Sequence, residues 1–270
     1  MALPVRIGVL RGLAKEISTS ARDDRPLAVG GALADVLRKE LVRDGDPAAV
    51  RIRDPEGAAL YLYVLGSTVK EADEELLKRA RRARVPIVAI TDGDGRIPYV
   101  LATDVVRLTP GSGFPVEEIA EAVARKLGED ATALAARLAV LRDAVCEQLI
   151  ASFARKNAIV AAAVFIPGAD LPLITLNQLR LVLRIAAAHG VEIDRERLPE
   201  IAATLGAGVG FRALARELLD VVPVAGWALK AGVAYAGTRA LGEAAVQWFG
   251  SRNPGTHATR QPAGVSTAGL

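Results

Sequence analysis

The sequence predicts an α/β domain followed by an all-α region, and two observations support this fold class. Between residues 25 and 128, short apolar runs alternate with stretches of helical spacing. From Asp130 to Phe249 the apolar stretches all have helical spacing, and the breaks are Pro-Gly, Gly-rich or polar turns. Alternating strands and helices are typical of a parallel sheet with helices on both faces. We therefore expect a small, parallel, doubly wound sheet followed by a compact helical domain.

The chain of 270 residues is long enough for two modest domains with cores of their own. We divide it into an N-terminal amphipathic helix and linker (1–24), the α/β domain (25–128), a connecting helix (129–156), the helical domain (157–250) and a tail without periodicity that we expect to be disordered (251–270).

The N-terminal segment has helical amphipathic spacing over residues 3–19, with Arg6, Arg11 and Lys15 between the apolar positions. Such a helix docks on the body of the protein or lies on a membrane surface, and the sequence leaves both open. It has no continuous apolar run typical of a secretion signal. We expect a cytoplasmic protein, with a peripheral location at the inner membrane as the alternative.

Five apolar runs of the α/β part have strand character. They are PLAVGG (26–31), AAVRI (48–52), ALYLYVLG (59–66), VPIVAIT (85–91) and a run within YVLATDVVRLT (99–109). Helices are expected within ALADVLRKELVRDG (32–45), KEADEELLKRARRAR (70–84) and GSGFPVEEIAEAVARKLG (111–128). The helix over 70–84 begins with acids and ends with bases, which complements its dipole.

The helical part begins with one long predicted helix over 131–157 and continues with a nearly uncharged stretch. From Asn157 to Leu179 the single charged side chain is Asp170. A membrane-spanning helix needs about 20 consecutive apolar residues. The Pro-Gly pair at 167–168 interrupts this stretch, and the pattern after it is amphipathic. We expect a soluble, tightly packed bundle, with partial insertion into a membrane as the alternative.

The start of the α/β domain lacks the residues that bind a nucleotide triphosphate. A P-loop requires G-x-x-x-x-G-K-[ST], and no Gly-Lys-Ser or Gly-Lys-Thr occurs in this chain. Gly30 and Gly31 lie between a strand and a helix, where they form a tight turn or leave room for an anion at the helix N-terminus. We interpret them as a turn, and we expect neither nucleotide binding nor enzymatic activity.

The order of elements nevertheless resembles a small GTPase of the Era-like class. In TDGD (91–94), Asp94 falls where such enzymes place the aspartate that reads guanine, whereas Thr91 and Asp92 depart from the N-K-x-D motif. The segment TPGSG (109–113) lies where such enzymes place the S-A-[KL] turn that packs behind the guanine base, and its residues also differ from that motif. The resemblance implies a degenerate GTPase-like domain. Asp92 and Asp94 are otherwise interpreted as a solvated turn.

Five cations crowd the end of the helix predicted over 70–84: Lys78, Arg79, Arg81, Arg82 and Arg84. We interpret them as a solvated helix end, with a patch for anionic lipid or an acidic partner as the alternative. Nucleic acid is not expected, because no aromatic residues are interleaved with the cations.

Metal and cofactor sites are not expected, because the chain has one cysteine, Cys146, and two histidines, His189 and His257. Cys146 is predicted to be a buried structural thiol. His189 precedes a glycine at a helix end, where it is expected to lie near the last carbonyls.

The segment from Lys156 to Gly250 resembles a bacterial helical domain of unknown function that is often fused behind Era-like GTPase domains. Its markers here are IPGAD, NQLRLVLRIAAAHG, GFRALAREL, VPVAGW and AYAGTRALGEAA. Some members of that family are inner-membrane proteins, and the resemblance implies no catalytic residues. Within this segment we expect Asp170 to cap a helix or to pair with an arginine, with a perturbed buried carboxylate as the alternative. The candidate partners are Arg180, Arg184 and Arg212, and Trp227 is a predicted core or interface anchor.

These observations predict a non-catalytic regulatory or scaffold protein that acts through a protein partner or through self-association. Two alternatives stay open. One is peripheral docking on anionic lipid, and the other is binding of a small ligand at the strand ends of the α/β domain.

Overall fold

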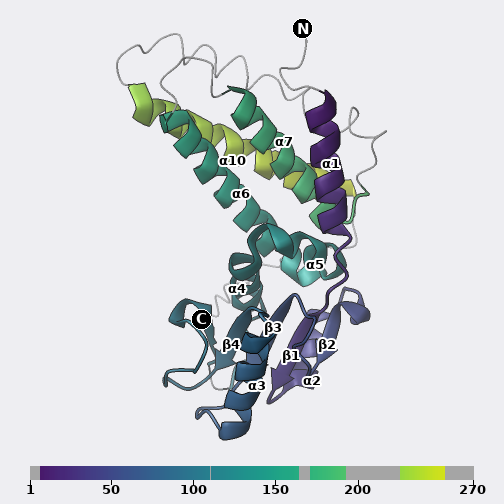
Figure 1. The fold of residues 1–270 in the computed structure, drawn as a ribbon, viewed down its shortest axis with the longest axis vertical. Coiled ribbons are helices and arrows are strands. Elements are labelled where there is room, and N and C mark those ends of the chain that lie inside the picture. The colour runs from purple at the N-terminus through teal and green to yellow at the C-terminus, as the bar shows by residue number, and fades with distance from the viewer. Residues whose placement is uncertain (1–6, 110, 164–170, 193–225, 253–270) are drawn as a thin grey trace, which may run out of the picture.

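The computed structural model describes residues 7–109, 111–163, 171–192 and 226–252, and it has the predicted α/β domain followed by helices (Figure 1). The sheet has five parallel strands in the order β2-β1-β3-β4-β5. The strands are β1 (Leu27–Gly31), β2 (Val50–Ile52), β3 (Leu60–Val64), β4 (Ile87–Thr91) and β5 (Val105–Arg107).

Helices cover both faces of the sheet, as a doubly wound fold requires. On one face α2 (Ala34–Leu41) and α4 (Val116–Leu127) pack on alternate strand residues such as Leu60 and Leu62. On the other face α3 (Glu71–Arg82) packs on Tyr61 and Tyr63. The alternation along β3 therefore divides the domain into an aliphatic core and a tyrosine-containing core.

The strand predicted within 99–109 is β5, at Val105–Arg107. Tyr99 has a φ of 64°, which a strand does not accommodate, and Ala102–Asp104 form one turn of 3-10 helix. The chain between β4 and β5 is consequently a loop with an exposed Tyr99 and Leu101.

The prediction of a single long helix over 131–157 is wrong, because the chain is extended at Leu138. The elements are a 3-10 turn (Gly128–Ala131), α5 (Thr132–Arg137) and α6 (Ala139–Ala163). Leu138 forms a bridge with Gly45, and the neighbouring Arg137 carbonyl accepts a hydrogen bond from the Asp46 N–H at 2.8 Å. The loop after α2 thus interrupts the helix by taking up its backbone groups.

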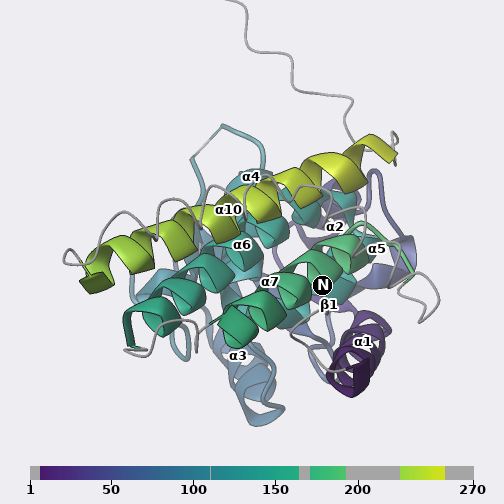
Figure 2. The same cartoon turned by 90° about the horizontal axis from the view of Figure 1, so that it is seen from above.

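The helical region is built from α1 (Ile7–Ala21), α5, α6, α7 (Leu171–Ala188) and α10 (Gly226–Arg252). Seen from above, α6, α7 and α10 lie side by side, with α1 beyond α7 (Figure 2). Leu13, Ala14 and Ile17 of α1 are buried in the core that this helix shares with α7. In the structure the N-terminal helix docks on the body of the protein, which is the first of the two alternatives left open by the sequence.

A polar network of side chains joins α6, α7 and α10. The buried Asn157 side chain donates to Thr238 Oγ1 at 2.9 Å, and Asn177 donates to Asn157 Oδ1 at 2.8 Å. Nearby, Gly242 permits close approach, since a Cβ there would lie 2.5 Å from Ile150. Buried polar groups with satisfied partners fix one arrangement of the helices, because any other leaves them unpaired.

Among the described helices, none has a stretch both long and apolar enough to cross a bilayer.

Candidate functional site

A crevice of about 740 Å³ opens beside the carboxyl ends of β1, β2 and β3. The strand order reverses between β1 and β3, because the chain passes from β1 to β2 on one side and then returns to β3 on the other. Open parallel sheets bind ligands outside the strand ends at such a switch point. This crevice is therefore the first candidate for a ligand-binding site.

The two glycines at the end of β1 are required by packing against the neighbouring strand. Gly31 has a φ of 85°, and a Cβ there would lie 1.9 Å from the carbonyl oxygen of Val64. A Cβ on Gly30 would lie 2.1 Å from the Tyr61 hydroxyl. The next amide, that of Ala32, donates to the Val64 oxygen at 2.9 Å. Close strand contact thus explains the glycine pair, which forms the end of β1, while the turn into α2 follows at Ala32 and Leu33.

Asp73 organises the wall of the crevice at the start of α3. Its carboxylate accepts hydrogen bonds from the Lys70 backbone N–H at 2.9 Å and from the Tyr63 hydroxyl at 2.8 Å. The Tyr61 hydroxyl donates to the Arg53 carbonyl at 3.2 Å. Burial raises the pKa of both tyrosines above the ordinary value, so both hydroxyls stay protonated and act as donors.

The charges that line the crevice are balanced. Asp35 and Asp73 contribute two negative charges, and Arg53 and Lys70 contribute two positive charges. A triphosphate site concentrates positive charge and backbone amides on the phosphates. The lining of this crevice instead suits a small polar ligand without a large net charge.

Asp92 and Asp94 do not line the crevice, although the sequence comparison with a GTPase places Asp94 at a base-reading position. Asp94 is fully exposed and lies 3.7 Å from Arg107 in an ion pair. The residue that shapes this turn is Thr91, whose buried hydroxyl donates to the Gly66 carbonyl at 3.0 Å and accepts from the Gly93 N–H at 3.0 Å. In the sequence, Thr91 is recognisable only as a residue that differs from the N-K-x-D motif.

Three or more His, Cys, Asp or Glu side chains do not gather into a metal-binding group anywhere in the described part of the chain.

The five cations at the end of α3 are divided among different neighbours. Arg79 forms ion pairs with Glu56 at 2.9 Å and Asp54 at 3.7 Å, and Lys78 lies 4.0 Å from Glu75. Arg81 and Arg84 instead line a second, larger concavity. Arg82 is exposed. The sequence cluster is therefore not one uniform patch.

The predicted partners of Asp170 have other carboxylates beside them. Arg180 lies 2.8 Å from Glu16 of α1, and Arg184 lies 2.7 Å from Glu129 at the junction of the two regions. Asp170, Arg212 and the Trp227 side chain lie outside the described residues. These ion pairs fasten α1 and the 3-10 turn to α7.

Cys146 and His189 occupy structural positions. Burial raises the pKa of Cys146 to about 12, so the thiol stays protonated and unreactive at neutral pH. Nδ1 of His189 lies 2.9 Å from the Ile185 carbonyl oxygen at the end of α7, which confirms the predicted location.

A protein-family model described as "Domain of unknown function (DUF697)" matches residues 125–264. The match covers more than half of the 270 residues and begins before the segment whose motifs carry the resemblance, so it includes α5 and all of α6. No curated protein and no solved structure matches the chain. Because this family model matches more than half of the chain, the chain belongs to the DUF697 family.

Proposed function

We propose that this chain is a non-catalytic regulatory or scaffold protein. In this proposal a GTPase-like domain without a P-loop is joined to a helical interaction domain, and the protein acts by binding protein partners. The balanced charge of the strand-end crevice and the close packing of Gly30 and Gly31 support the non-catalytic part.

The observation that carries the binding part is the grouping of exposed apolar side chains. In the described part of the chain, the exposed large hydrophobic residues lie at the start of α2, in the loop before β5, and near the carboxyl end of α6 and the amino ends of α7 and α10. Single exposed apolar residues are normal on a protein surface, whereas grouped ones mark interaction sites. The groups are the α2 patch (Leu33 and Val36), the loop patch (Tyr99 and Leu101) and the bundle end (Ile159, Leu173 and Leu229).

The three groups are held on one framework. A continuous hydrophobic core runs from the sheet through α4 and α5 into α6, α7 and α10. The bundle end lies at the end of the helices farthest from the sheet, beyond the Asn157 network (Figure 1). Interaction groups at separate, fixed positions are what a scaffold needs to hold two partners in a defined arrangement.

Site-specific photo-crosslinking in the host cell tests this proposal. A benzoylphenylalanine residue replaces Val36, Leu101 or Leu173 in the full chain, and the exposed Arg43 and Arg125 serve as control positions. We expect discrete protein adducts at the patch positions and none at the controls. Adducts to phospholipid alone, at Leu173, would instead favour peripheral docking on anionic lipid. The absence of adducts at all three patches contradicts the proposal.

A second candidate function is small-ligand binding at the strand ends. The crevice volume of about 740 Å³ lies in the range of roughly 300–1,000 Å³ that is usual for small-molecule sites. Native mass spectrometry of the protein purified from its host checks this candidate. A bound small molecule that is lost on Tyr63→Phe and Lys70→Met substitution would support ligand binding.

A further inference from the structure

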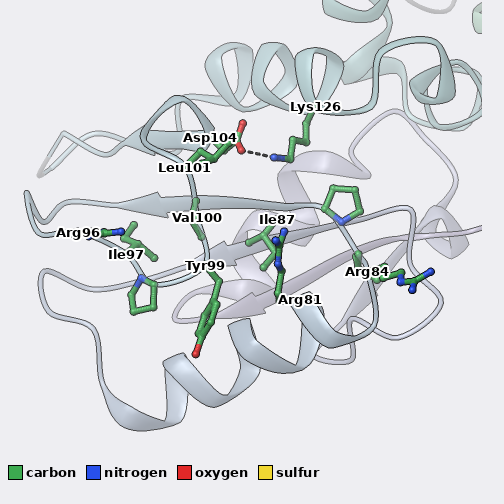
Figure 3. Close-up of a pocket in the computed structure, with 13 residues that line it drawn as sticks. Arg81, Arg84, Ile87, Arg96, Ile97, Tyr99, Val100, Leu101, Asp104 and Lys126 are labelled. Carbon is green, nitrogen blue, oxygen red and sulfur yellow. Dashed lines mark hydrogen bonds and ion pairs between the residues drawn. The ribbon is translucent and has the colours of Figure 1, made fainter.

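A concavity of about 1240 Å³ lies beside the end of α3, and Tyr99 and Leu101 of the loop patch belong to its lining. The buried Val85, Ile87 and Ile97 give its lining an apolar part, which we call the floor. Ile87 and Ile97 are labelled in Figure 3. Val85 and Ile87 stand at the amino end of β4, so this concavity lies at the opposite end of the strands from the switch-point crevice. We call it the arginine pocket, after Arg81, Arg84 and Arg96 in its lining.

The charge of the arginine pocket is unbalanced. Arg81, Arg84 and Arg96 form no ion pair with any described residue, whereas Lys126 is paired with Asp104, the one acid in the lining. Figure 3 shows Arg96 and Arg84 toward opposite ends of the pocket, with Arg81 between them. The three guanidinium groups therefore line an extended surface rather than one point.

Arg84 occupies a position that glycine normally fills. The end of α3 is a Schellman motif, in which the Val85 N–H donates to the Ala80 carbonyl at 3.0 Å and the Arg84 N–H to the Arg81 carbonyl at 3.1 Å. The motif requires positive φ at Arg84, which has a φ of 58°. Tyr99, another residue of the lining, has a φ of 64°. Both residues thus carry a side chain at a backbone conformation that favours glycine, and such strained positions cluster at functional sites.

We propose that the arginine pocket binds an acidic segment of a partner protein, with an apolar side chain of that segment on the pocket floor. Three unpaired guanidinium groups complement carboxylates, which arginine binds with two parallel hydrogen bonds. The exposed Tyr99 and Leu101 on the rim are residue types that anchor protein interfaces. The volume exceeds that of usual small-molecule sites of up to roughly 1,000 Å³, which favours an extended occupant. The proposal rests on the proposed function, because it supplies a surface for the protein partner.

Fluorescence anisotropy of the full chain with labelled peptides of about ten residues tests the proposal. The probes alternate Glu or Asp with Leu or Tyr, and matched probes carry Ser in place of the apolar residues or Lys in place of the acids. We expect salt-sensitive binding of the acidic-apolar probes alone. Arg81→Glu and Arg96→Glu should each weaken it by about tenfold or more. Arg82→Ala, on the same helix but outside the pocket, should leave it unchanged.

Arg84→Gly separates a binding role from a structural one. Relief of the positive φ should raise Tm by about 2–4 °C, while the loss of the guanidinium weakens probe binding. Arg84→Lys, which keeps the charge and the strain, should retain part of the binding without the rise in Tm. Equal probe affinity for Arg84→Gly and the unmodified chain would contradict the proposal.

If the arginine pocket binds another class of molecule, the measurements differ as follows. Binding of phosphatidylglycerol vesicles or single-stranded DNA through the same arginines, without peptide binding, overturns the proposal, as does self-association that Arg81→Glu abolishes. If crosslinks at Leu173 and Val36 persist while no acidic probe binds, the scaffold function stands and this proposal fails.

Discussion

Replacing Gly31 by alanine is expected to lower the free energy of unfolding by about 2–5 kcal/mol. A side chain at the φ of 85° is strained, at a cost of about 1–2 kcal/mol. The new Cβ would also lie 1.9 Å from the backbone oxygen of Val64, and forced overpacking costs a further 1–3 kcal/mol, approximately. The contact is with the adjacent strand of the sheet, so a rotamer change does not relieve it. Urea unfolding followed by circular dichroism measures the loss.

Gly57 is the matched control for this substitution. Its φ is 73°, and a Cβ there has no atom within 4 Å. Gly57→Ala therefore carries the strain without the overlap, and it should cost about 1–2 kcal/mol. Equal costs for Gly31→Ala and Gly57→Ala would show that β1 and β3 are not packed as described.

Glu129→Ala is expected to destabilise the protein by about 3 kcal/mol, because it leaves a buried cation without its nearest carboxylate. The Arg184 side chain is 6% exposed and lies 2.7 Å from Glu129. Removal of one partner of a buried pair costs about 3–5 kcal/mol, and we expect the lower end because Glu16 stays within 3.7 Å of Arg184.

A second substitution distinguishes the buried charge from a general packing defect. Arg184→Met combined with Glu129→Leu should recover most of the lost stability, because it removes the cation together with its partner. Glu121→Ala, which removes an exposed pair with Arg125 at 4.0 Å, should change the free energy of unfolding by about 0–1 kcal/mol. Failure of the double variant to recover stability would contradict the role assigned to Arg184.

The same carboxylate should make stability depend on pH in the acid range. Burial opposes ionisation of Glu129, but the hydrogen bond from Lys156 and the charges of Arg184, Lys156 and Arg180 outweigh it and lower its pKa. The unfolded chain therefore binds a proton at a higher pH than the folded one, and the contribution of Glu129 is complete above the ordinary carboxyl pKa. It should be lost as pH falls from that value through the lower pKa of the folded protein. Subtracting the pH profile of Glu129→Gln from that of the unmodified chain isolates this contribution.

The sheet could be predicted because its sequence signals are local. Short apolar runs separated by helical spacing indicate a parallel sheet whatever the order of the strands. The end of helicity at Leu138 could not be predicted, because its cause is the loop around Gly45 and Asp46, far away in the sequence. The local pattern of 131–157 is helical throughout, and a tertiary contact overrides it.

The candidate sites show the same division between local and distant causes. The helical spacing predicted over 70–84 places Arg81 and Arg84 on one side and Arg79 on another, so the sequence could have indicated that the cation cluster is divided. In the structure α3 ends at Arg82, and Arg84 follows it with a φ of 58°. The contribution of Arg96 to the same pocket depends on the path of the loop after β4, which no local motif specifies. Asp92 and Asp94 lie outside the strand-end crevice for a related reason. The turn after β4 packs on the Ser67 backbone, and Asp94 points into solvent.

The claim that the α/β domain works without a nucleotide is tested most directly by the thermal unfolding of the full chain in excess Mg-GTP and Mg-ATP. A ligand that binds the folded state at one hundred times its Kd stabilises it by about 2.7 kcal/mol, which is readily seen in Tm. We expect the same Tm with and without either nucleotide, and no release of phosphate. A saturable rise in Tm with GTP or ATP, accompanied by phosphate release, would contradict the account and make the strand-end crevice a catalytic site.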